Sequence, residues 1–128
     1  MKTQIRRTLT RPFDHVLDDL PRALATEGFG ILTRIDMRET LKKKLDVDMR
    51  PYVILGACNP PLAHQAVTHD LDVGLMLPCN VIVYDNLDGT TTVAAVDPMM
   101  TMAKDDPALQ PIATEVGTKL SRALATLA

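Results

Sequence analysis

The chain is poor in aromatic residues and in net charge, and both shortages exclude classes of protein. Its 128 residues include two Phe, two Tyr and no Trp. A hydrophobic core must therefore depend on Leu, Val, Ile, Ala and Met. The formal net charge is only −2. We expect no nucleic-acid partner, because contacts to phosphates need clustered Lys and Arg.

Long apolar runs, serine and cysteine are scarce as well. No stretch reaches the ~18 apolar residues of a membrane-spanning helix, so we expect no membrane insertion. Residues 1–12 mix charged with apolar side chains and lack the apolar middle of a signal peptide. Ser121 is the only serine and has no histidine near it in the sequence, so the sequence does not favour a serine hydrolase. Two cysteines are too few for a disulfide framework and indicate free thiols in a cytoplasmic protein.

Length and hydrophobic periodicity predict one α+β domain over residues 1–128. Strands are expected at 2–9, 29–35, 52–58, 80–86 and 91–96, and helices at 12–27, 36–45, 59–67 and 106–128. Pro21 should kink or divide the first helix, and the run 52–58 is apolar enough for a strand covered on both faces. The order predicts a mixed, mostly antiparallel sheet of about five strands with helices on one face, the long C-terminal helix lying across it.

Two cysteines occur in similar surroundings, each beside an apolar run and each followed by asparagine. Cys58 precedes Asn59, Cys79 precedes Asn80, and His64 lies between them. Asn59 with its following prolines predicts a helix N-cap, so the sulfur of Cys58 is expected near free N–H groups that favour a thiolate. If the strands of Cys58 and Cys79 are neighbours, the two thiols and His64 are candidate ligands for zinc or copper(I).

The same residues have simpler interpretations, which stay open. Free cysteine is among the most buried residue types, so Cys58 and Cys79 are also candidates for the core, and a disulfide between them is a third alternative. Neither Cys-x-x-Cys nor His-x-x-x-His spacing occurs to specify a metal site. Asn59 and Asn80 suit a helix cap and a strand start, or else a pair of amides that hold a ligand.

Two further residues complete the candidate ligand site. Arg50 stands shortly before the strand predicted at 52–58 and is a candidate partner for a carboxylate or phosphate. It stands near the one basic concentration of the chain, which is otherwise explained as a solvated helix face and consists of Arg34, Arg38, Lys42, Lys43 and Lys44. Tyr52 lies on the strand itself, where a ring with one polar tip is usually half-buried.

Five segments resemble one known family, and the resemblance covers nearly the whole chain: residues 28–36, 40–45, 50–63, 77–81 and 96–98. The central one reads Arg-Pro-Tyr-Val-Ile-Leu-Gly-Ala-Cys-Asn-Pro-Pro-Leu-Ala. They are similar to the domain of unknown function 302 family of small prokaryotic proteins. The resemblance implies a β-α-β(4)-α arrangement like that of TATA-binding proteins, and a homodimer. It implies no catalytic residue, and a shared fold does not bring DNA binding with it.

Two functions follow as hypotheses, and whether the protein is an enzyme stays open. The first is a non-enzymatic, homodimeric domain that binds a small ligand between the sheet and the final helix, through Cys58, Asn59, Asn80, Tyr52 and Arg50. The alternative is a thiol- or metal-dependent redox protein or enzyme that uses Cys58, Cys79 and His64. A purely structural partner protein, with an exposed apolar patch, is the third interpretation.

Overall fold

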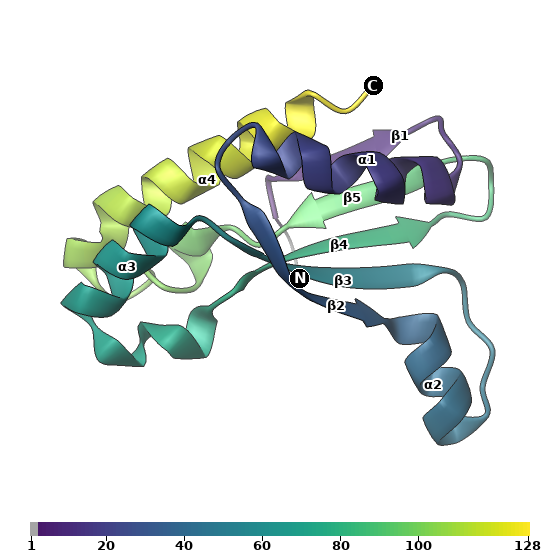
Figure 1. The fold of residues 1–128 in the computed structure, drawn as a ribbon, viewed down its shortest axis with the longest axis horizontal. Coiled ribbons are helices and arrows are strands. Elements are labelled where there is room, and N and C mark those ends of the chain that lie inside the picture. The colour runs from purple at the N-terminus through teal and green to yellow at the C-terminus, as the bar shows by residue number, and fades with distance from the viewer. Residues whose placement is uncertain (1–2) are drawn as a thin grey trace.

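Five strands form a single sheet in the computed structural model, which describes residues 3–128 (Figure 1). They are β1 (Arg6–Leu9), β2 (Gly30–Asp36), β3 (Tyr52–Cys58), β4 (Cys79–Asp85) and β5 (Thr91–Ala95). The order across the sheet is β1-β5-β4-β3-β2, and each neighbouring pair is antiparallel. The α+β class and the strand number predicted from the sequence are confirmed. Lys2, at the start of the first predicted strand, lies outside the described residues.

Four α-helices and three 3₁₀ segments connect the strands within residues 3–128. They are α1 (Phe13–Ala25), α2 (Met37–Leu45), α3 (Pro60–His69) and α4 (Gln110–Ala125), with η1 (Leu71–Met76), η2 (Pro98–Met100) and η3 (Pro107–Leu109). The long C-terminal helix is therefore α4, and the β-α-β(4)-α order is present with α2 and α3 inserted. No helix in this range is long and apolar enough to cross a membrane.

The hydrophobic core lies between one face of the sheet and the pair α1 and α4 (Figure 1). Strand side chains that point to this face meet the apolar stripes of the two helices. The fully buried members include Val53, Leu55, Val81, Val83, Val93, Val16, Leu20, Leu24, Leu120 and Leu124. Burying one such side chain stabilises the fold by about 1.5–3 kcal/mol, so this layer fixes the strands that carry the candidate site residues.

α1 continues through Pro21, so the expectation that this residue divides the helix is wrong. Proline removes one hydrogen bond from the helix and crowds the preceding turn. The helix nevertheless buries Val16, Leu20 and Leu24 against the sheet on either side of Pro21. Burial of these side chains outweighs the local cost of the proline.

The second face of the sheet is more open than its sequence suggests. Ile35, Ile54 and Ile82 stand opposite one another in register on β2, β3 and β4. Ile54 and Ile82 are half-buried, and Ile35 is 45% exposed. The expectation that β3 is covered on both faces is therefore wrong. Its apolar run arises because one face enters the core while Ile54 belongs to an apolar row on the other.

α2 projects from the end of β2 and contributes little to the core (Figure 1). The side chain of Asp36 accepts a hydrogen bond from the backbone N–H of Glu39 at 2.9 Å, which confirms the predicted helix start. None of the residues of α2 is buried, and Leu45 is 65% exposed. Short caps and ion pairs, rather than packing, therefore hold this helix.

Candidate functional site

Both cysteines line one cavity where β3 ends and β4 begins. Ala57 of β3 stands opposite Cys79 of β4, so Cys58 lies one residue farther along the neighbouring strand. The cavity has a volume of about 290 Å³ and is closed by α3, α4 and the segment before β4. Leu32, which is 65% exposed, stands at its open side. We call this space the cysteine cavity.

The two thiols of the cysteine cavity differ in their access to solvent. Both are free, with Cys58 half-buried and Cys79 only 5% exposed. Burial, and to a lesser degree the nearby charge of Cys58, raises the pKa of the Cys79 thiol to about 11. Cys79 is therefore a protonated thiol at neutral pH, and the thiolate is the reactive form of cysteine. Cys58 is the thiol that a reagent in solution reaches first.

His64 does not join the two thiols. It is exposed on α3, although Leu62 and Ala63 of the same helix line the cysteine cavity. Across residues 3–128, no group of three or more His, Cys, Asp or Glu side chains is placed to hold a metal ion. The zinc or copper site predicted from Cys58, His64 and Cys79 is therefore not formed. The helical spacing that turns Leu62 inward turns His64 to solvent.

Asn59 serves as a structural link at the rim of the cysteine cavity. Its side-chain oxygen accepts from the N–H of Leu62 at 3.5 Å, which confirms the predicted N-cap of α3. Its Nδ2 donates to the carbonyl oxygen of Glu27 at 3.1 Å. Gly28 has a φ of +86°, and a Cβ there would lie 3.0 Å from Nδ2 of Asn59. The amide is thus engaged on both sides by the chain, and it ties the turn after α1 to the start of α3.

Asn80 follows Cys79 directly but does not line the cysteine cavity. It is exposed on β4, opposite Gly56 of β3. A Cβ at Gly56 would come within 2.1 Å of the Thr33 hydroxyl and 2.6 Å of the Pro78 ring, so the strands and the segment before β4 pack closely here. Of the two amides predicted to hold a ligand, only that of Asn59 belongs to a residue that lines this cavity.

Tyr52 and Arg50 lie at the opposite end of β3. Tyr52 opens this strand of seven residues and Cys58 closes it, which places them about 20 Å apart at roughly 3.3 Å per residue. The Tyr52 ring stacks on that of Tyr84 with centroids 5.6 Å apart. Arg50 is exposed and donates to the carbonyl oxygen of Asp85 at 3.3 Å. The five candidate ligand residues therefore do not form one site.

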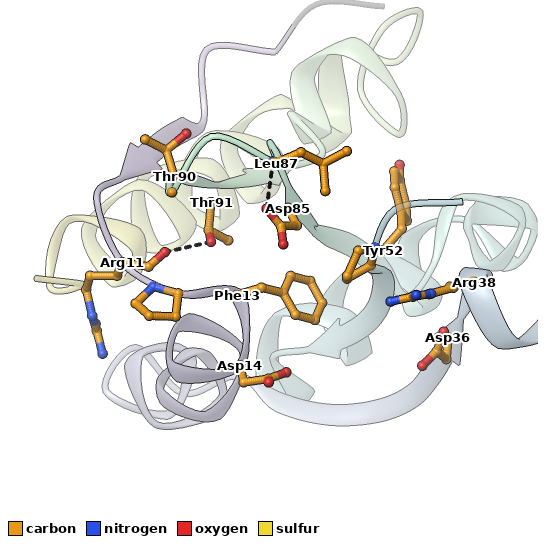
Figure 2. Close-up of a pocket in the computed structure, with 13 residues that line it drawn as sticks. Arg11, Phe13, Asp14, Asp36, Arg38, Tyr52, Asp85, Leu87, Thr90 and Thr91 are labelled. Atoms are coloured by element: carbon orange, nitrogen blue, oxygen red, sulfur yellow. Dashed lines mark hydrogen bonds between the residues drawn. The ribbon is translucent and has the colours of Figure 1, made fainter. Parts of the chain in front are cut away.

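A second and wider cavity lies at the Tyr52 end, shown in Figure 2. We call it the polar cavity. Its volume is about 670 Å³, and four separated parts of the chain line it: the segment around Phe13, the start of α2, the start of β3 and the β4–β5 hairpin. The Thr91 hydroxyl donates to the carbonyl oxygen of Arg11 at 2.8 Å, which joins the hairpin to the segment before α1. No local sequence pattern predicts this cavity, because only the sheet order brings these segments together.

Comparisons with known proteins agree with this fold. The family model "Domain of unknown function DUF302" matches residues 5–127. One solved structure, of an uncharacterised conserved DUF302 protein from Bacillus stearothermophilus, superposes with a TM-score of 0.85 at 32% sequence identity. The match covers 96% of this chain and 98% of that one. No curated protein matches the chain. With its sequence and its fold in agreement, the chain belongs to the DUF302 family.

Proposed function

We propose that the protein is a non-enzymatic binding domain that holds a small apolar molecule in the cysteine cavity. The observation that carries the proposal is one small, mostly apolar space lined by residues of β3, β4, α3 and α4, with Cys58 and Cys79 among them. Its volume of about 290 Å³ lies at the lower end of ligand pockets, which span roughly 300–1,000 Å³. Leu32 at the open side and the half-buried Cys58 give a ligand a route from solvent.

The lining of the cysteine cavity defines the class of ligand. Leu62, Ala63 and Ala66 of α3 face it, together with Val116 of α4 and Met102. Among its described lining residues there is no carboxylate, amine, guanidinium or imidazole. A charged ligand would lose its hydration without gaining a partner there, which is costly. Apart from the two thiols, this lining offers no group for general acid–base catalysis, which supports binding rather than turnover.

Indole is a suitable apolar probe, followed by its effect on the ¹H–¹⁵N spectrum of the protein. Addition of indole should shift the amide signals of Cys58, Ala63 and Ala66. Ala63→Leu fills the cavity and should weaken indole binding ~10-fold or more, since a filled pocket leaves no space for the ligand. Gln65→Leu adds the same side chain on an exposed position of α3 and is the matched control. Equal binding by both variants, or shifts confined to other regions, would refute the proposal.

Thiol redox chemistry is a second candidate, favoured by the proximity of Cys58 and Cys79 in one cavity. Hydrogen peroxide can accept two electrons from the two thiols, which then lose two protons and form one S–S bond as two waters are released. This proposal predicts a Cys58–Cys79 disulfide after mild oxidation, detected by peptide mass spectrometry under non-reducing conditions. Cys79→Ala should instead give a sulfenic acid at Cys58. Recovery of both free thiols after oxidation would exclude this candidate.

We further propose that the protein acts as a cytoplasmic homodimer, paired through the open face of the sheet. Ile35, Ile54 and Ile82 form an apolar row there, and a two-fold interface must be complementary to itself. A second copy of these three isoleucines meets that demand, and the charge of Arg6 lies at the far end of the same row. The free cysteines suit a reducing compartment.

Light scattering after size exclusion tests the dimer directly. The wild-type protein should have twice the 14.0 kDa mass of one chain. Ile54→Lys places a charge in the row and should convert the dimer to monomer. Leu71→Lys adds the same charge at a side chain that is 83% exposed on η1, away from the sheet, and should not. A wild-type monomer, or a dimer that survives Ile54→Lys, would contradict this interface.

A further inference from the structure

The polar cavity contains a guanidinium group that the fold itself does not use. Arg38, on the first turn of α2, is exposed and has no hydrogen bond or ion pair within residues 3–128. Figure 2 shows its guanidinium extending from α2 into the cavity, with the Asp36 carboxylate on the same side. Arg11, by contrast, is bound to the Asp19 carboxylate at 2.6 Å and points away from the cavity. Arg38 is therefore the cation available to a ligand, and a guanidinium suits a carboxylate by its paired donors.

Carboxylate oxygens of the same cavity are also available. Asp14, on the first turn of α1, has no hydrogen bond or ion pair within the described part of the chain. Asp85 accepts from the N–H of Leu87 at 2.7 Å through one oxygen, which leaves the other free among the described residues. Figure 2 draws both carboxylates around the Phe13 ring. Such groups suit an ammonium ion, because each offers acceptors only.

Aromatic side chains line the same cavity as Arg38 and the carboxylates of Asp14, Asp36 and Asp85. Phe13 is half-buried in the lining, and Tyr52 is half-buried and held by its stack on Tyr84. Their exposed ring surfaces suit an apolar or aromatic side chain. A purely anionic ligand would face the carboxylates of Asp14, Asp36 and Asp85, and a purely cationic one would face Arg38. A ligand with both charges has a partner for each.

We propose that the polar cavity binds a small zwitterion with an apolar side chain, that is, a free amino acid or a short peptide. The ligand carboxylate lies at Arg38, its ammonium group at Asp14 and Asp85, and its side chain against Phe13 and Tyr52. A volume of about 670 Å³ is ample for one amino acid or a dipeptide. This site is separate from the cysteine cavity and goes beyond the function proposed for it.

Calorimetric titration with three related probes separates the contributions of the two charges. Phenylalanine carries both charges, phenylalanine amide only the positive one and N-acetylphenylalanine only the negative one. Phenylalanine should bind at least ~10-fold more tightly than either analogue, because each analogue leaves one charged group of the protein without a partner. No detectable binding of phenylalanine, or equal binding of all three, would overturn the proposal.

Variants then assign each charge to its residue. Arg38→Gln should weaken phenylalanine binding ~10-fold and leave phenylalanine amide unaffected, since only the carboxylate meets the guanidinium. Asp14→Asn should weaken both phenylalanine and its amide. Arg34→Gln is the matched control, because Arg34 is also exposed and does not line the cavity. Circular dichroism checks that each variant is folded. Equal losses in Arg34→Gln and Arg38→Gln would contradict the assignment.

Discussion

The two ends of β3 lie about 20 Å apart at roughly 3.3 Å per residue, and their surroundings are opposite in chemistry. At the Cys58 end the strand enters a small space closed by two helices and lined by hydrocarbon and sulfur. At the Tyr52 end it opens into a wide cavity lined by arginine, aspartate and aromatic rings. One rigid strand thus supports two different environments. The elements packed around each end of β3, more than the sequence of the strand, therefore decide what chemistry that end supports.

Burial by the surrounding elements also explains why the two cysteines differ in their properties although their sequence surroundings are similar. Cys79 lies in the core with a pKa near 11, whereas Cys58 remains half-buried at the strand end. Both are followed by asparagine, yet Asn59 caps a helix and Asn80 faces solvent. The two cysteines therefore differ in role, and so do the two asparagines that follow them.

The substitution with the largest expected effect on stability tests how closely the Cys58 end of β3 is packed. Gly56→Val introduces atoms where the Thr33 hydroxyl and the Pro78 ring already lie within 2.6 Å of a Cβ. Overpacking of this kind should lower the free energy of unfolding by about 3 kcal/mol. Urea denaturation followed by circular dichroism measures it. Gly30→Ala, where a Cβ would meet nothing within 4 Å, is the control and should change stability little. Similar losses in both variants would show that close packing is not specific to Gly56.

The raised pKa of Cys79 predicts a pH-dependent loss of stability. Folding favours the protonated thiol, so its contribution is fully present below the ordinary pKa of 9.0 and is lost as pH rises through about 11. The shift corresponds to about 2–3 kcal/mol. The difference in unfolding free energy between wild type and Cys79→Ala should therefore shrink or reverse between pH 8 and pH 11. A difference that stays constant over this range would contradict the buried position of Cys79.

Asn59 is expected to have a smaller effect, confined to the Cys58 end. Asn59→Ala removes the cap of α3 and the bond to the Glu27 carbonyl, and should cost about 1–2 kcal/mol. Asn59→Asp keeps the capping oxygen but loses the donor to Glu27, so it should recover only part of this loss. Thermal unfolding monitored by circular dichroism distinguishes the two variants. Full recovery by aspartate would mean that the link to Glu27 contributes nothing.

The smallest expected effect is at the Tyr52 end. Arg38→Gln should change the unfolding free energy by less than about 0.5 kcal/mol, because surface side chains without partners contribute little. Urea denaturation followed by circular dichroism measures this change, with Arg34→Gln as the control. A loss comparable to that of Asn59→Ala would show that Arg38 supports the fold, and it would remove the reason to assign the guanidinium to a ligand.

The sequence predicted the fold better than the candidate sites. Periodicity and capping residues such as Asp36 and Asn59 are local signals, and they gave the elements and their order correctly. Cys58 and Cys79 line one cavity because β3 and β4 are neighbours in the sheet, which periodicity and capping residues do not specify. His64 was misplaced because one helical turn decides whether a side chain faces the cavity or solvent. The polar cavity combines Phe13 and Tyr52 from distant segments, which no local pattern records.

The most direct test of the proposed ligand cavity is the alkylation of the native protein by iodoacetamide, mapped to each cysteine by mass spectrometry, with and without saturating indole. The account predicts rapid labelling of Cys58, much slower labelling of Cys79, and a several-fold slower reaction of Cys58 when indole is bound, because thiolate character and access both control the rate. Equal labelling of the two thiols, or a Cys58 rate that indole leaves unchanged, would contradict it.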